Sequence, residues 1–136
     1  MSKADKRLWK RIWWTLFTRD RAVAVALGRP CGISTDDSDV EMVTEEDFLD
    51  DEGDRPAEYQ PDPIHVQFFL SYAKLSEIMG LVLSQQYSVA VKRKHNALDL
   101  MHSDMALADW LQNCPKEVFW VKEKHHFWSA LLHCHY

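Results

Sequence analysis

The sequence predicts an all-α protein, an irregular bundle of about four helices with a long acidic loop. Apolar residues recur at helical steps in four separate segments, whereas no segment alternates with a strand's period of two over a useful length. Only four glycines and five prolines interrupt the 136 residues, which leave room for one domain. The helices are expected over residues 5–28, 63–86, 91–113 and 118–136, with an acidic linker over 36–62.

The first helix has a wide apolar stripe with aromatic neighbours, which predicts a buried face, and polar residues take its opposite side. The stripe consists of Leu8, Ile12, Leu16, Val23 and Leu27, with Trp9, Trp13, Phe17 and Ala24 alongside. The opposite side consists of Lys6, Lys10, Arg11, Thr18 and Arg21. The sequence Gly28-Arg29-Pro30 ends the helix. Gly28 easily adopts the left-handed conformation of a helix end, Arg29 before a proline is extended, and Pro30 forbids continuation.

Asp20 interrupts this pattern. It lies seven positions after Trp13 and therefore projects from nearly the same face as the tryptophans. Burying an unpaired charge costs roughly several kcal/mol, so we expect a structural pair between Asp20 and Arg29 that locks the helix to the following loop. The alternative is a catalytic carboxylate, but no second acid, histidine or nucleophile stands at a helpful spacing.

The acidic segment predicts a solvated, partly disordered linker. Twelve acidic residues stand between Asp36 and Glu58 against Arg55 alone. The segment is expected to be a charged loop packed across, or hanging off, the helical body, and the alternative is an acidic transcriptional activation segment. Apolar residues that could anchor the segment are Val40, Met42, Val43, Phe48 and Leu49.

Three further helices follow. Asp62-Pro63 is a start signal for the second, and Asn113-Cys114-Pro115 closes the third. The second helix has the stripe Ile64, Phe68, Tyr72, Leu75, Met79 and Val82, the third has Val91, Leu98, Met101, Met105, Ala108 and Leu111, and the fourth has Phe119, Phe127, Leu131 and Cys134.

Several function classes have little support in the sequence. Three widely spaced cysteines argue against a disulfide scaffold and fit a reducing compartment, no secretory signal is found, and the longest uncharged stretch, 78–91, is too short and polar to span a membrane. No phosphate-binding glycine loop or nucleophile elbow suggests an enzyme. The group His125, His126, His133, Cys134 and His135 lacks the paired spacing of zinc ligands.

Direct DNA binding is also disfavoured. Two short basic clusters, Arg7-Lys10-Arg11 and Lys92-Arg93-Lys94, stand in a chain with a net charge of −5 and a pI near 5.7. Phosphate binding needs a more concentrated basic surface. The second cluster is at most a weak nuclear localisation signal.

Leu8-Trp9, Trp13-Trp14, Asp20-Arg21 and Gly28-Arg29-Pro30, followed by Ile33 and acidic residues, resemble the middle homology region of fungal binuclear-zinc-cluster transcription factors. This region is also named the xylanolytic-activator regulatory domain. Within it, the sequence most resembles that of cutinase-type, fatty-acid-responsive regulators. The resemblance is specific over residues 7–48 and looser over 64–136. It implies a partial copy of a larger helical regulatory domain, because it covers a third to a half of that domain and lacks its preceding helices.

The resemblance implies a nuclear, non-enzymatic role in controlling transcription, through intramolecular contacts or protein partners. The family's zinc and its DNA contacts belong to a six-cysteine cluster, and no two cysteines here lie within four residues. We therefore expect no cofactor in this chain, DNA contact only through a zinc cluster outside it, and no membrane. A stripe wider than three helices can cover also leads us to expect self-association. The alternative function is a stand-alone helical protein-interaction module.

Overall fold

The computed structural model describes residues 1–49, 61–87 and 97–136, and these residues contain helices and no strands. The all-α prediction is confirmed. The elements are α1 (Lys3–Leu27), α2 (Pro63–Tyr87), α3 (Ala97–Gln112) and α4 (Phe127–His135), with two short 3₁₀ turns, η1 (Thr35–Asp37) and η2 (Glu45–Phe48).

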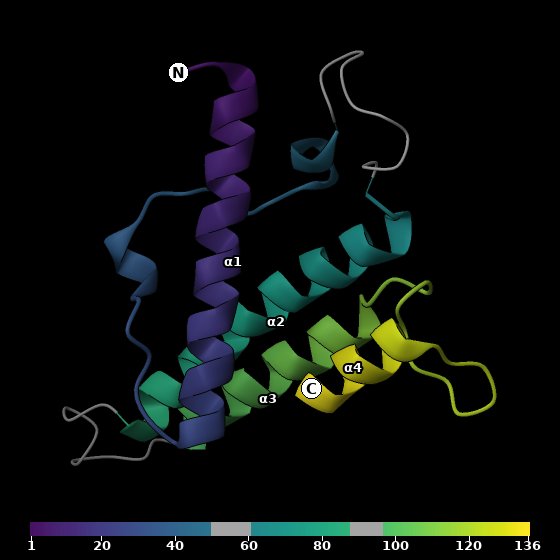
Figure 1. Ribbon diagram of the computed structural model, residues 1–136. Coiled ribbons are helices and arrows are strands. Elements are labelled where there is room, and N and C mark those ends of the chain that lie inside the picture. The colour runs from purple at the N-terminus through teal and green to yellow at the C-terminus, as the bar shows by residue number, and fades with distance from the viewer. Residues whose placement is uncertain (50–60, 88–96) are drawn as a thin grey trace.

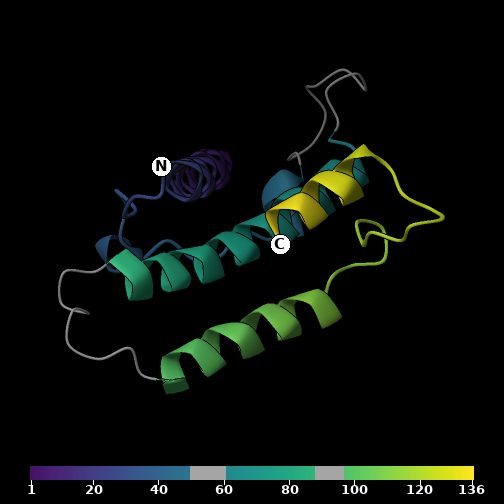
Figure 2. The ribbon, with the colours of Figure 1, turned by 90° about the horizontal axis from the view of Figure 1, so that it is seen from below.

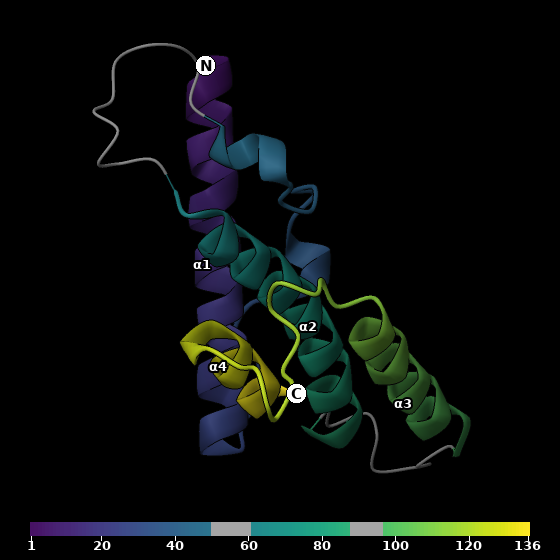
Figure 3. The same cartoon turned by 90° about the vertical axis from the view of Figure 1, so that its right-hand side faces the viewer.

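The α2 helix is the centre of the arrangement. Helices α1, α3 and α4 each pack against it, and η2 packs against both α1 and α2. Figure 1 shows α1 crossing α2, and Figure 2 shows α2 lying between α1 and α3. The α4 helix lies beside α2, across the molecule from the N-terminal end of α1 (Figure 3). The α2 helix is long and apolar enough to cross a membrane, with a mean hydropathy of 1.3. A core helix that packs against α1, α3 and α4 has the same apolar composition.

Two hydrophobic cores lie on different sides of α2. The first joins α1, the segment after it and α2 through Trp14, Phe17, Val43 and Ala73. The second joins α2, α3, the 114–118 turn and α4 through Leu75, Trp110, Val118 and Leu132. The indole N–H of Trp110 donates to the carbonyl of Ser71 at 2.9 Å, which satisfies the polar atom of a buried ring.

The predicted buried face of α1 is correct for Phe17 and Ala24, which are buried, and wrong for its aliphatic residues. Leu8, Ile12, Leu16 and Leu27 are exposed and Val23 is half-buried. The buried side of the helix consists of Trp14, Phe17, Thr18, Arg21 and Ala24, so it includes two residues of the predicted polar side, Thr18 and Arg21. Both faces are apolar, and the aromatic one offers more area to α2 and to the segment after α1. The buried hydroxyl of Thr18 donates to the carbonyl of Thr15 at 3.0 Å, so it needs no other partner.

The predicted solvated linker is also corrected where it is described. Residues 36–49 pack across α1, with Val43 buried and Val40, Met42 and Phe48 half-buried, whereas Leu49 is exposed. Of the two arrangements expected for a charged loop, this stretch therefore adopts the one packed across the helical body. Its physical basis is the cluster of aromatic rings on α1, which gives the apolar residues of the segment something to cover. The remainder of the predicted linker, 50–60, lies outside the described residues.

Of the later helices, α4 departs most from the prediction. The α3 helix ends at Gln112, as the Asn113-Cys114-Pro115 signal predicts, and the predicted start at 91 lies outside the described residues. The fourth helix begins at Phe127 and not at 118. His126 and Ser129 cap its N-terminus reciprocally, and turns at 115–118 and 121–124 occupy the residues before it.

Candidate functional site

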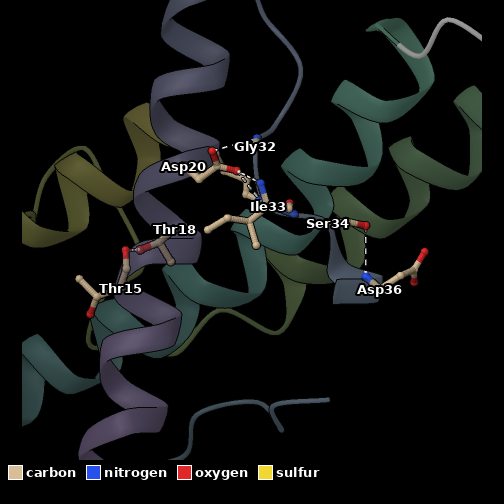
Figure 4. A network of polar contacts seen from close by, with 8 residues as sticks. Thr15, Thr18, Asp20, Gly32, Ile33, Ser34 and Asp36 are labelled. Carbon is tan, nitrogen blue, oxygen red and sulfur yellow. Dashed lines mark hydrogen bonds and ion pairs between the residues drawn. The ribbon is translucent and has the colours of Figure 1, made fainter. Parts of the chain in front are cut away.

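Asp20 holds the loop that follows α1 against the helix. Its Oδ1 accepts a hydrogen bond from the backbone N–H of Gly32, and its Oδ2 accepts one from the N–H of Ile33, each at 3.0 Å (Figure 4). The Nη1 of Arg21 donates to the same Oδ2 at 3.0 Å. Three donors thus converge on one carboxylate, which offsets the cost of removing it from water.

The predicted pair between Asp20 and Arg29 is wrong. Arg29 is exposed, and its backbone N–H bonds the carbonyl of Ala24 at 3.0 Å as part of the helix end. Gly28 adopts the predicted left-handed conformation, with φ 60° and ψ 43°. The chain therefore turns sharply at the end of α1, and the residues it brings back to Asp20 lie three and four positions after Arg29. The loop contributes backbone N–H groups to the carboxylate and not a side-chain charge.

Arg21 is the buried cation of the site, although the sequence pattern predicts it on the polar side of the helix. It is 2% exposed. Its Nη1 also donates to the carbonyl of Ile33 at 2.6 Å, and its guanidinium carbon lies 3.6 Å from the centre of the Phe17 ring. A guanidinium over an aromatic face is attracted by the ring's quadrupole, so Phe17 stabilises the charge as well as filling the core. The Nε atom has no hydrogen-bond partner among the described residues.

Two glycines allow the side chains of Asp20 and Arg21 to approach the backbone closely. A Cβ on Gly32 would lie 3.1 Å from Oδ1 of Asp20, and a Cβ on Gly80 would lie 3.1 Å from Nε and 3.2 Å from Nη2 of Arg21. Glycine inside a helix costs about 1 kcal/mol relative to alanine, so Gly80 in the middle of α2 needs a packing reason. The close approach of Arg21 supplies that reason. We call Asp20, Arg21, Gly32, Ile33 and Gly80 the Asp20–Arg21 clamp.

A pocket of about 330 Å³ opens beside the clamp, between the loop after α1 and the C-terminal half of α2. Arg21, Pro30, Cys31 and Glu77 are among the residues that line it. Burial raises the pKa of Glu77, and the positive charges of Arg21 and Lys74 oppose that rise. Burial also raises the pKa of the Cys31 thiol, so this cysteine is not activated as a thiolate. The arrangement fixes the position of α1 and provides no activated nucleophile.

The two tryptophans of the motif lie two turns earlier on α1. Trp14 is buried, and its indole N–H donates to the backbone carbonyl of Glu41 at 2.8 Å. Trp13 is half-buried and stacks on Phe17 with ring centres 5.0 Å apart. Trp14 therefore fastens the acidic segment to α1, while Phe17 connects the tryptophans to Arg21. The predicted site residues Trp13, Trp14, Asp20 and Arg21 share one connected network, whereas Gly28, Arg29 and Pro30 shape the turn that leads the loop into it.

Sequence reasoning missed Gly32, Ile33 and Gly80. Backbone donors such as those of Gly32 and Ile33 carry no residue-type signal, so only the loop geometry reveals them. An isolated glycine inside the helical pattern of 63–86 is the one available sign that another chain element approaches closely at Gly80.

The C-terminal histidines serve in packing and capping. His133 stacks on Trp120 with ring centres 4.7 Å apart, His135 lies against Tyr72, and His126 caps α4. Burial lowers the pKa of His135. In the described part of the chain, no three potential metal-ligating side chains are gathered into a group.

Known proteins give a consistent identification of this chain. Residues 1–112 match the model of the fungal specific transcription factor domain. The chain is 75% identical to cutinase transcription factor 1 alpha of Fusarium vanettenii over 137 residues, which is all of this chain and 15% of that protein. It is 35% identical to cutinase transcription factor 1 beta of the same fungus over 118 residues, covering 79% of this chain and 13% of that protein. No solved structure matches it.

A further relative, the acetamidase regulatory protein of Aspergillus fumigatus, is 30% identical over 132 residues, covering 97% of this chain and 16% of that protein. The chain thus spans about a sixth of the length of the curated relatives it matches, and these relatives are transcriptional regulators. The matched region contains the whole Asp20–Arg21 clamp and the tryptophans of α1. The chain belongs to the fungal-specific transcription factor domain family and is a regulatory part of a fungal transcription factor.

Proposed function

We propose that this chain is the regulatory, non-DNA-reading part of a binuclear-zinc-cluster transcription factor that controls RNA polymerase II transcription in the nucleus. The proposed targets are carbon-source or lipid-utilisation genes. The 75% identity to a protein named as a cutinase transcription factor supports the lipid-linked targets, since cutin is a polyester of fatty acids. Relatives named as acetamidase regulators support control of nutrient use more broadly.

The observation that carries this proposal is the match of residues 1–112 to the fungal specific transcription factor domain, and this region contains the Asp20–Arg21 clamp. The ion pair between Asp20 and Arg21 and its hydrogen bonds to the loop favour one arrangement of α1 and α2, because moving the helices apart would leave a buried charge unpaired. The clamp fixes α1 across α2 and leaves the opposite face of α1 exposed. Regulation would then act through contacts of the exposed helix faces with protein partners or with other parts of the same transcription factor.

We assign DNA reading and zinc to a cysteine cluster outside this chain. The net charge of −5 supports this assignment, because a duplex phosphate backbone repels an acidic protein. The three free cysteines also lie far apart along the sequence. The isolated chain should show no duplex binding in a mobility-shift assay at physiological salt, and a chelator should leave its circular dichroism unchanged.

The main experiment uses the full-length transcription factor with Arg21→Ala, a reporter gene behind a cutinase promoter, and the protein level measured in the same cells. We expect reporter output per molecule to change while the DNA sequence preference and the affinity of the zinc-cluster domain stay unchanged. Lys124→Ala, in an exposed turn, is the control. A shift in DNA sequence preference caused by Arg21→Ala would contradict the proposal.

The alternative function is a stand-alone helical interaction module, which the exposed apolar residues of α1 and α3 favour. The transcript distinguishes the two functions. An open reading frame upstream of Met1 that encodes six clustered cysteines supports the transcription factor, and a separate promoter directly before Met1 supports the module.

A further inference from the structure

The outer face of α1 is an apolar stripe that no described residue covers. Side-chain exposure is 47% for Leu8, 39% for Ile12, 58% for Leu16 and 65% for Leu27. These residues recur at steps of four and eleven along α1, so they lie on one side of the helix. We call them the α1 outer face. A helix that is apolar on two sides requires a second layer of protein, since exposed stripes of this kind mark interaction sites.

The α1 outer face borders a groove in which another helix can bind. A groove of about 530 Å³ runs beside it, with Leu8, Ile12 and Leu16 on one wall and Phe48 and Phe69 on the other. Arg11 also lines the groove, and its buried Nε has no hydrogen-bond partner among the described residues. The exposed Arg19 stands within the apolar stripe. An occupant therefore has to bring apolar side chains together with carboxylates.

The α3 helix of the same chain has this character. Its outward residues include Leu98, Met101 and Met105, which are 56%, 58% and 59% exposed. Asp104 and Asp109 flank this stripe, which we call the α3 outer face. The α3 helix contains three aspartates and no lysine or arginine, whereas the charged residues at the α1 outer face are Arg11 and Arg19. Methionines adapt their shape to a partner surface, which suits a helix-in-groove contact.

We propose that the α1 outer face of one copy binds the α3 outer face of a second copy. The α2 helix lies between α1 and α3 (Figure 2), and both helices pack against it. One copy therefore cannot join its own faces, and the contact is heterologous, leaving one face of each kind free on a dimer. Further copies can add to these free faces through the same contact, which produces assemblies longer than a dimer. In the contact that we propose, Arg19 of one copy pairs with Asp104 of the other.

Sedimentation of the 136-residue chain over a roughly hundredfold concentration range tests the proposal. We expect reversible association beyond the dimer that weakens as salt screens the charges. Arg19→Glu and Asp104→Lys should each weaken association roughly tenfold, because each places like charges opposite each other. The double variant in one chain should recover most of the loss, because the pair is then reversed. Lys124→Glu and Glu123→Lys, in the exposed turn before α4, are charge-matched controls that should change little.

Both faces are exposed, so these substitutions should leave the helical circular dichroism intact. Recovery in the double variant identifies α1–α3 pairing, because a contact between two α1 faces could not be restored by a change on α3. A double variant that associates no better than the singles would overturn the proposal. A wild-type chain that stays monomeric would also overturn it, and would leave the α1 outer face to other parts of a longer protein.

Discussion

Arg21 of α1 and Gly80 of α2 meet where the two helices cross, and the glycine leaves room for the guanidinium and for nothing more. An added Cβ would approach Nε to 3.1 Å and Nη2 to 3.2 Å. Asp20, the carbonyl of Ile33 and the Phe17 ring hold the guanidinium from the other sides. The arginine therefore has little freedom to move away, and the identity of residue 80 determines how closely α1 and α2 pack.

Gly80→Ala should destabilise the chain by about 1 kcal/mol, even though alanine favours the helix, because crowding of the pinned Arg21 outweighs the gain in helix propensity. Gly80→Val should cost about 3 kcal/mol. Denaturant unfolding measures both values. In an Arg21→Met background, Gly80→Ala should become neutral or stabilising, and equal losses in both backgrounds would refute the close approach.

Asp20→Ala should destabilise the chain by about 3 kcal/mol, because it leaves Arg21 buried without its carboxylate and two backbone N–H groups without an acceptor. Arg29→Ala and Asp36→Ala, at exposed positions, should each stay within about 0.5 kcal/mol. Urea unfolding of the three variants provides the comparison. Replacing Asp20 and Arg21 together by apolar residues should recover part of the loss, and strictly additive losses would show that the two side chains do not act as a pair.

Trp14→Phe should keep most of the apolar packing and remove one hydrogen bond, that from the indole N–H to the carbonyl of Glu41. We expect a loss of about 1 kcal/mol from the hydrogen bond. Hydrogen exchange should also accelerate at residues 40–43, which this bond holds against α1. Trp9→Phe is the matched control, since Trp9 is 61% exposed. Unchanged exchange at 40–43 in Trp14→Phe would mean that packing alone holds the segment.

Asp47 makes the attachment of the acidic segment depend on pH. Burial by itself raises the pKa of this carboxyl, but hydrogen bonds from Thr44 and the ammonium of Lys10 at 2.9 Å outweigh it, so the pKa is lowered. A carboxyl with a lowered folded pKa stabilises the fold above its unfolded pKa of about 4, and loses that contribution as pH falls through the folded value. Wild-type stability should therefore fall below about pH 4.

Asp47→Asn should remove this part of the acid dependence, whereas Glu46→Gln, at an exposed neighbouring position, should retain it. Urea midpoints measured between about pH 6 and pH 2 give both curves. Parallel curves for Asp47→Asn and the wild-type chain would place the acid sensitivity at other carboxyls.

The sequence contains enough signal for the fold class and for the end of α1, because helical periodicity and the left-handed Gly28 before Pro30 are local properties. The sequence does not indicate which of the two apolar faces of α1 is buried. Leu8, Ile12 and Leu16 form the more regular stripe, but Trp14 and Phe17 find partners on α2 and on the segment around Val43. That choice depends on tertiary contacts that no local pattern encodes.

The candidate site was predictable in part for the same reason. The sequence indicates that Asp20 is a carboxylate in need of a partner, since its position on the helix is a local property. Its partners were not, because the nearest cation along the loop, Arg29, points elsewhere and the adjacent Arg21 turns inward. The start of α4 likewise depends on His126 and Ser129, whose reciprocal cap is not a common sequence signal.

The position of α2 between the two cores has a consequence for how this chain acquires its structure. Ala73 belongs to the core shared with α1, and Leu75, two residues later, belongs to the core shared with α3 and α4. Each half of the molecule can therefore assemble on α2 independently, since neither needs the other as a template. Such a chain should unfold in steps, with the amides of α2 opening last, and damage to one half should leave the other half structured.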